Sequence, residues 1–85
     1  MAPYIVMEIS TKNNYVLDSW VCSTKEEAAE CLRERYKAAC AYNFCCGMPA
    51  PVDCLDNGFF TRRLTNGIEL TYCIEQSQYY KKNKL

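Results

Sequence analysis

Seven cysteines and no histidine define the reactive side chains of this 85-residue chain. Without an imidazole, the chain lacks the commonest general base, the cysteine–histidine nucleophile pair and the mixed zinc sites. Because seven is odd, the cysteines cannot all pair within one chain, and we expect reduced thiols acting as small buried hydrophobes. A disulfide-bonded protein is the alternative. The cysteines are Cys22, Cys31, Cys40, Cys45, Cys46, Cys54 and Cys73.

Four of these cysteines are close enough in the sequence to suggest a zinc site made of thiolates. They are Cys40, Cys45, Cys46 and Cys54. The usual two-residue spacing between ligands is absent, however, and adjacent cysteines chelate awkwardly. A redox role for Cys45-Cys46 would need a base or a cation nearby in the sequence, and none is found there. We therefore predict structural thiols, no metal and no other cofactor.

The carboxylates and glycines are also better explained by structure than by catalysis. Asp53 and Asp56 lie in one predicted loop, but carboxylate catalysis needs two acids held in a cleft. Asp56-Asn57-Gly58 is typical of a turn. The three glycines are isolated, so the chain has no glycine-rich loop for phosphate. We predict that the protein is not an enzyme.

Charge and hydropathy argue against two classes of partner. Acids and bases cancel at ten each, whereas nucleic-acid binders usually carry excess positive charge. No segment approaches the roughly 20 apolar residues that cross a bilayer. Glu8 interrupts the only stretch that could begin a secretory signal. The charge balance therefore disfavours a nucleic-acid partner, and we expect no membrane contact and a cytoplasmic protein.

The first predicted elements form a β-hairpin. Residues 4–11 and 15–22 are rich in strand formers, and asparagines between them favour a tight turn. With Asn13-Asn14 as a two-residue turn, the pairs are Ile5–Cys22, Met7–Trp20, Ile9–Asp18 and Thr11–Val16. Because side chains alternate along a strand, this register places Ile5 on the core side. It places Tyr4, Val6, Leu17 and Val21 on the outer face.

A second hairpin is predicted near the end of the chain. Residues 59–64 and 68–76 flank Asn66-Gly67, a strong hairpin signal. The expected pairs are Phe59–Ile74, Thr61–Tyr72 and Arg63–Leu70. In this register the core side carries Ile68, Leu70, Tyr72 and Ile74, and the outer face carries Phe60, Leu64 and Cys73. Residues 77–85 are predicted to be a flexible basic tail.

A long helix is predicted between the hairpins, over residues 24–46. Ser23 and Thr24 are N-cap candidates with glutamates three residues later, and Ala28, Leu32, Tyr36 and Ala39 recur at helical spacing. Gly47 and two prolines end it. The helix would be about 34 Å long, against about 23 Å for a seven-residue strand. Its overhanging end, with Tyr42 and Phe44, needs cover from residues 48–57 or from a second chain.

The order hairpin, helix, hairpin predicts a single α+β domain over residues 1–76. We expect a four-stranded sheet of order 2-1-4-3 with one long helix packed on one face. In this order and layout, the chain resembles the β-grasp arrangement of ubiquitin-like and immunoglobulin-binding bacterial domains. The resemblance covers residues 4–76 and rests on the order of the elements, so it implies a fold and no function.

Surface aromatic residues suggest a binding role. The chain has seven tyrosines, a residue enriched at protein interfaces. We predict a non-enzymatic protein-interaction module whose partner is another protein or a second copy of the chain. In size and layout it resembles the small inhibitors that phages and mobile elements direct at host defence systems, anti-CRISPR proteins among them. The predicted binding residues are Tyr4, Val6, Leu17, Tyr42, Phe44, Phe60, Arg62, Arg63, Tyr79 and Tyr80.

Two other functions are left open by the sequence. The first is an oligomeric protein that binds or sequesters a small ligand between subunits, at a site lined by tyrosines and by Arg62 or Arg63. The second is a weak nucleic-acid binder. It would combine Arg62-Arg63 with the lysines at 81, 82 and 84 and the neighbouring tyrosines, through charge and stacking.

Overall fold

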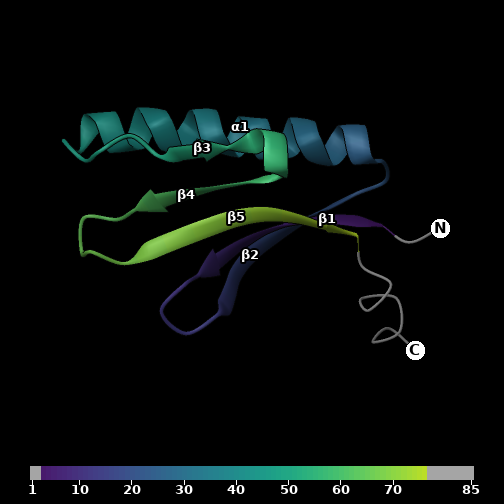
Figure 1. The fold of residues 1–85 in the computed structure, drawn as a ribbon, viewed down its shortest axis with the longest axis horizontal. Helices are drawn as coiled ribbons and strands as arrows, with labels where there is room; N and C mark the ends of the chain where they lie inside the picture. The colour runs from purple at the N-terminus through teal and green to yellow at the C-terminus, as the bar shows by residue number, and fades with distance from the viewer. Residues whose placement is uncertain (1–2, 77–85) are drawn as a thin grey trace.

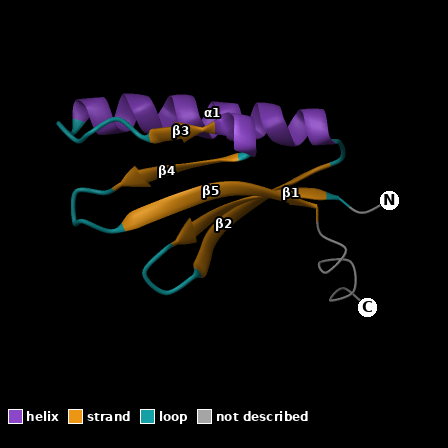
Figure 2. Ribbon diagram, viewed as in Figure 1, coloured by secondary structure: helices purple, strands orange, loops and turns teal. Residues whose placement is uncertain are grey.

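One long helix lies along one face of a five-stranded antiparallel sheet in the computed structural model, which describes residues 3–76 (Figures 1 and 2). The predicted tail, 77–85, lies outside the described residues. In chain order the elements are β1 (Tyr4–Ser10), β2 (Tyr15–Cys22), α1 (Lys25–Cys45), β3 (Val52–Cys54), the short 3₁₀ helix η1 (Leu55–Asn57), β4 (Phe59–Arg63) and β5 (Glu69–Gln76).

The strand order is β2-β1-β5-β4-β3. The predicted sheet of order 2-1-4-3 is therefore wrong: there are five strands instead of four, and the order differs. The β-grasp layout implied by the resemblance is corrected with it. The additional strand, β3, pairs with β4 at one edge. At three residues it is too short to show an alternating pattern in the sequence. The α+β class, with a helix on an antiparallel sheet, is confirmed.

The first hairpin is shifted from its predicted register. The pairs run from Tyr4–Cys22 to Glu8–Asp18 and then, after a bulge, from Ile9–Val16 to Ser10–Tyr15. Residues 11–14 form the connection instead of Asn13-Asn14 alone, and Asn14 adopts a left-handed conformation with φ 59°. A shift of one residue exchanges the two faces of a strand. Val6 consequently faces α1, and Ile5 faces outward.

The second hairpin is shifted for a similar reason. Phe59 pairs with Cys73 and Phe60 with Tyr72. The Leu64 amide donates to the Ile68 carbonyl (2.8 Å), so the loop contains three residues and ends at Gly67, whose φ is +87°. Three-residue loops with a left-handed final residue are a common hairpin type. Phe60 therefore faces α1, contrary to the predicted outer position.

The helix begins and ends close to the predicted residues. The Glu27 amide donates to Thr24 Oγ1 (3.1 Å), and the Ser23 amide donates to Glu27 Oε1 (2.8 Å). These two bonds satisfy backbone donors that a helix start leaves open. At the other end, Gly47 is left-handed with φ +70°, and the Met48 amide donates to the Asn43 carbonyl (2.8 Å).

Removing the N-cap is expected to lower the free energy of unfolding by a measurable amount. Thr24→Ala deletes the hydroxyl that accepts from Glu27, and loss of such a cap costs about 1 kcal/mol of unfolding free energy. Thr24→Ser keeps the hydroxyl and should stay within about 0.5 kcal/mol of the wild type. Urea unfolding followed by circular dichroism measures both. Equal losses in the two variants would show that the hydroxyl does not stabilise the helix.

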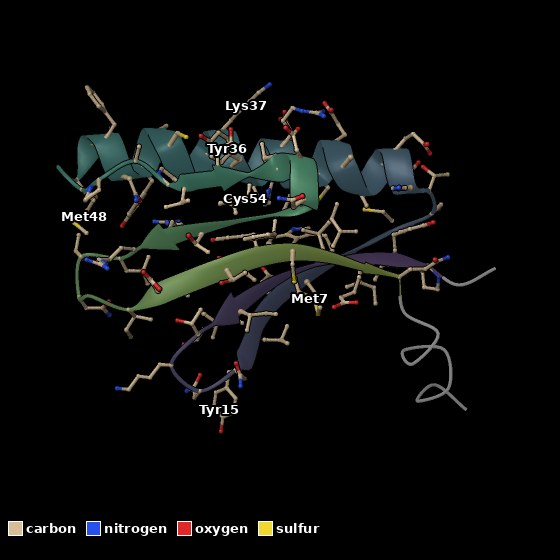
Figure 3. All side chains as sticks on the ribbon, in the orientation of Figure 1. Met7, Tyr15, Tyr36, Lys37, Met48 and Cys54 are labelled. Carbon is tan, nitrogen blue, oxygen red and sulfur yellow. The ribbon has the colours of Figure 1, made fainter. Side chains whose placement is uncertain are left out.

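The core lies between α1 and the centre of the sheet. Its buried members are Val6, Ala28, Leu32, Ala39, Phe60, Leu70 and Tyr72. The Phe60 ring stacks on the Tyr72 ring with centroids 4.5 Å apart and meets the edge of Tyr36 at 5.3 Å. Tyr36 belongs to the inner side of α1, whereas the next residue, Lys37, points away from the sheet (Figure 3). Aromatic packing thus joins the helix to β4 and β5.

One polar residue fastens the end of the helix. Asn43 is buried, and its Nδ2 donates to the carbonyls of Pro49 (3.0 Å) and Arg63 (3.4 Å). These bonds hold the chain after α1 against β4, so that it runs back along the helix and forms β3 (Figure 1). Residues 48–57 thus return along the helix on the Asn43 side and place β3 at the sheet edge, but the predicted cover of the helix end is incomplete, because Phe44 stays 85% exposed.

Candidate functional site

The largest group of exposed apolar side chains in residues 3–76 lies on β2. Tyr15, Val16, Leu17 and Val21 are each more than half exposed. β2 is the last strand of the sheet, and within the described residues nothing pairs with its outer side. Backbone groups on an open edge can pair with another strand. We call these four residues with their strand the β2 edge.

The opposite edge of the sheet is much shorter. β3 has three residues and carries one large exposed apolar side chain, Val52, which is 60% exposed. Just before it, Pro49 and Pro51 lack the backbone donor that an added strand would need. Short strands and prolines are the usual protection of a sheet edge. The two edges of this sheet therefore differ strongly in their capacity to pair.

The face of the sheet opposite α1 is also partly apolar. Ile5, Met7 and Ile9 of β1 point to this side, and in the paired strands Cys73 and Phe59 do so as well. Ile5 is buried, and the other four are half-buried. Burial, and secondarily the charge of Glu75, raises the pKa of the Cys73 thiol, which keeps this thiol protonated at neutral pH. This face is continuous with the β2 edge through the β1–β2 pairing.

The end of the helix presents two aromatic rings. Phe44 is 85% exposed, and Tyr42 is more than half exposed, while Asn43 between them points inward. The Tyr42 ring lies under the guanidinium of Arg62, at 5.0 Å from the ring centroid. Cys45 and Cys46 are exposed beside these rings. The returning loop therefore covers the Asn43 side and leaves Phe44 open.

The ten predicted binding residues do not form one surface. Leu17, Tyr42 and Phe44 are exposed, as binding residues must be. Val6 and Phe60 were placed on the outer face, and this is wrong: both are fully buried under α1, because each hairpin is shifted by one residue. Tyr4 is partly buried and packs against the core. Tyr79 and Tyr80 lie outside the described residues.

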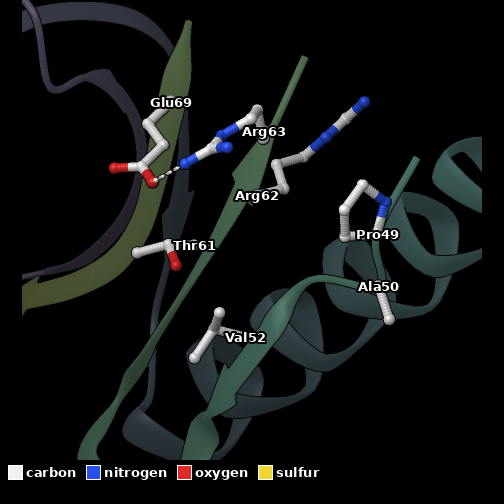
Figure 4. A pocket seen from close by; sticks show the side chains of 7 residues that line it. All are labelled: Pro49, Ala50, Val52, Thr61, Arg62, Arg63 and Glu69. Atoms are coloured by element: carbon white, nitrogen blue, oxygen red, sulfur yellow. Dashed lines mark hydrogen bonds and ion pairs between the residues drawn. The ribbon is translucent and has the colours of Figure 1, made fainter. Parts of the chain in front are cut away.

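The adjacent arginines of β4 point to opposite sides of the sheet. Arg63 Nη2 lies 3.4 Å from Glu69 Oε2, and Arg62 extends away from that glutamate (Figure 4). A groove of about 190 Å³ lies beside them and extends to Val52 and Pro49. Since Arg63 is paired with an acid and Arg62 is stacked on Tyr42, the two do not join into one basic patch.

A second, larger hollow lies between α1 and the sheet, and no sequence pattern indicated it. This charged cleft measures about 290 Å³. Its lining comes from five elements: Glu8, Asp18, Trp20, Arg35, Ala38, Ala39, Tyr42, Arg62 and Tyr72. Two acids, two arginines and three aromatic rings therefore face one space. Because these residues are distant in the sequence, only the tertiary packing brings them together.

The acids of the charged cleft lie side by side on the sheet. Glu8 of β1 is directly opposite Asp18 of β2 and also directly opposite Tyr72 of β5. The Tyr72 hydroxyl donates a hydrogen bond to Glu8. Burial first, and then this bond and the charge of Glu8, raises the pKa of Tyr72 to about 12, against a smaller opposite effect of Arg62. Tyr72 is therefore a firm hydrogen-bond donor at neutral pH.

The arginines of the charged cleft are held by aromatic rings. The Arg35 guanidinium lies 5.0 Å from the centroid of the Trp20 ring, and Arg62 lies at the same distance from the Tyr42 ring. Within residues 3–76, neither arginine forms an ion pair with a carboxylate. The Nε atom of each is buried without a hydrogen-bond partner there. A guanidinium group at this distance from a ring forms a cation–π interaction.

Other chemistry finds little support among the described residues. All seven cysteines are free thiols. In residues 3–76 no group of three or more cysteine, aspartate or glutamate side chains is placed to hold a metal ion. No helix in this part of the chain is both long and apolar enough to span a bilayer.

The chain matches no protein-family model, no curated protein and no solved structure. The β2 edge and the charged cleft are therefore the two features from which a function can be inferred.

Proposed function

We propose that the protein is a non-enzymatic interaction module that binds a partner protein, or a second copy of itself, along the β2 edge. The observation that carries this proposal is the open eight-residue strand β2 with its four exposed apolar side chains. A strand added to such an edge gains backbone hydrogen bonds, and the side chains supply the apolar contact area. Apolar groups gathered in one place on a surface commonly mark a binding site.

The β2 edge is favoured over the other exposed groups for two reasons. At the helix end Phe44 is highly exposed, but the neighbouring Tyr42 ring already packs on Arg62. A basic surface for nucleic acid would need Arg62 and Arg63 together, and they point to opposite sides. Among residues 3–76, only β2 combines unpaired backbone, apolar side chains and continuity with a partly apolar sheet face. The helix end would serve as a secondary contact.

The more specific function, inhibition of a host defence system by a protein of phage or mobile-element origin, stays a prediction. It is supported by the small size of the chain, by the simple layout of helix and sheet, and by the exposed binding edge. Binding of a defence-system protein that depends on the β2 edge would support this version. Binding through β2 to the chain's own copy alone would contradict it.

A pair of matched valine variants tests the β2 edge. Val21 and Val52 are 58% and 60% exposed, and they lie on opposite edges of the sheet. Val21→Lys places a charge on the proposed interface and should weaken assembly at least about tenfold, whereas Val52→Lys should leave it within about twofold. Native mass spectrometry of protein isolated from its source measures the assembly. Both variants should fold normally, because substitutions at exposed sites rarely change stability by more than about 0.5 kcal/mol.

Hydrogen exchange adds a second test of the same proposal. In the assembled state, the β2 amides that point away from β1 should exchange more slowly than in the separated chain, because an added strand accepts their hydrogens. The amides of β3 serve as the control and should not change. A strict monomer without a bound protein, or equal loss of assembly in both valine variants, would refute the β2 edge as the interface.

A further inference from the structure

We propose that the charged cleft binds a carboxylate group between Arg35 and Arg62. This site is separate from the β2 edge, and the proposal stands independently of the interaction function. It rests on the unmet hydrogen-bonding capacity of two arginines, on the existing partners of the two acids nearby, and on the space between them.

The two arginines provide donors that the described residues do not use. A guanidinium carries five N–H groups and no acceptor. Every arginine and lysine found in an ion pair within residues 3–76 is a different one: Arg33 with Glu30, Lys37 with Glu34, and Arg63 with Glu69. Arg35 and Arg62 contact rings instead, and Arg62 additionally lies near the Tyr72 hydroxyl. The charged cleft therefore has donors available for an anion.

The acids of the cleft already accept hydrogen bonds. Glu8 accepts the hydrogen bond of Tyr72, and Asp18 Oδ1 accepts from the Ser19 amide at 2.8 Å. Their charges still act on whatever enters the cleft. Two acids and two arginines leave the lining with no net charge, so a ligand with one negative charge meets little repulsion. A doubly charged phosphate would double both the attraction to the arginines and the repulsion from Glu8 and Asp18, and so gains nothing to offset its larger desolvation cost. A carboxylate is therefore the favoured anion.

The geometry also suits a planar ligand. Each guanidinium carbon lies 5.0 Å from a ring centroid, and a guanidinium group can form two parallel bonds to a carboxylate. Ala38 and Ala39 form part of the wall, and their small side chains leave room for the rest of the ligand. A volume of about 290 Å³ accommodates a small organic acid or the acidic side chain of a partner.

Trp20 allows a direct test, because it is the only tryptophan and lies in the cleft under Arg35. Titration with propionate should change the tryptophan fluorescence saturably, whereas the neutral isostere propionamide should not. Arg35→Gln and Arg62→Gln should each weaken propionate binding at least about tenfold, since a charge-assisted pair is worth about 1.5–3 kcal/mol. Arg62→Lys keeps the charge, loses the planar fork and should also bind more weakly.

The neighbouring arginines are matched controls. Arg33→Gln lies on the same helix and Arg63→Gln on the same strand, both with their side chains outside the cleft, and both should bind propionate within about twofold of the wild type. A blocked peptide with one aspartate, titrated in parallel, identifies the source: tighter binding than propionate indicates a partner's side chain, and weaker binding a small acid. Absence of a saturable response to both probes, an unchanged response in Arg35→Gln and Arg62→Gln, or tighter binding of phosphate would overturn the proposal.

Discussion

Phe60→Ala is expected to lower the free energy of unfolding by about 3–5 kcal/mol. Phe60 is 0% exposed, and its ring contacts the rings of Tyr72 and Tyr36. Truncation removes both aromatic contacts and leaves a cavity under α1. Domains of this size have a total stability of only about 5–10 kcal/mol, so the variant should be close to unfolding at room temperature. Urea unfolding followed by circular dichroism measures the loss.

Phe59→Ala is the matched control for this prediction. Phe59 is the preceding residue of β4, lies on the opposite face of the sheet and is only half-buried. The Phe59→Ala substitution should lower the free energy of unfolding by about half as much as Phe60→Ala, or less. The predicted register had the reverse arrangement, with Phe59 inside. A larger loss in Phe59→Ala than in Phe60→Ala would therefore restore that register and contradict the structure.

Alkaline pH is expected to destabilise the domain through Tyr72. Burial and the bond to Glu8 raise the pKa of Tyr72 to about 12, whereas a tyrosine in the unfolded chain titrates near pH 10. Below pH 10 both states hold the proton, and the contribution is fully present. Between pH 10 and pH 12 only the unfolded chain releases it, so stability falls by up to about 1.4 kcal/mol per pH unit, or about 2–3 kcal/mol in total.

Comparison with Tyr72→Phe isolates this effect. The pKa values of the Cys31 and Cys73 thiols are also raised, mainly by burial. They remain in the variant, so the difference in slope between the two proteins belongs to Tyr72. Urea midpoints measured every half pH unit from 9 to 12 give both slopes. Parallel slopes would show that the Tyr72 hydroxyl loses its proton as easily in the folded state as in the unfolded one.

The helix was predictable because its signals are local. The cap at Thr24, the glutamates after it and the helical spacing of Ala28, Leu32 and Ala39 are all visible in neighbouring residues, and the structure confirms them. The presence of two hairpins could be predicted in the same way. Their registers could not, because the register depends on the length of each connection. Asn14 and Gly67 both adopt left-handed conformations, but in connections longer than two residues.

In the candidate sites, too, the features with local signals could be predicted, and those that depend on strand register could not. Exposure of Leu17, Tyr42 and Phe44 could be anticipated from their positions on the predicted elements. The charged cleft could not, since Glu8, Arg35 and Arg62 come from three elements whose relative position depends on the corrected registers. With the predicted register Glu8 would have pointed away from α1, and the cleft would have lacked one of its acids. The edge position of β2 was expected, and the blocked edge at β3 was not.

The unequal edges limit how this protein can self-associate. Two copies that met through β2 would be related by a twofold axis, and their joined sheet would end at a β3 strand on either side. Each edge of that sheet would be a three-residue strand preceded by prolines, so residues 3–76 offer a third copy no long open strand to pair with. Assembly by strand pairing would stop at the dimer. The apolar strand β2 that recruits a partner would therefore not start a fibre.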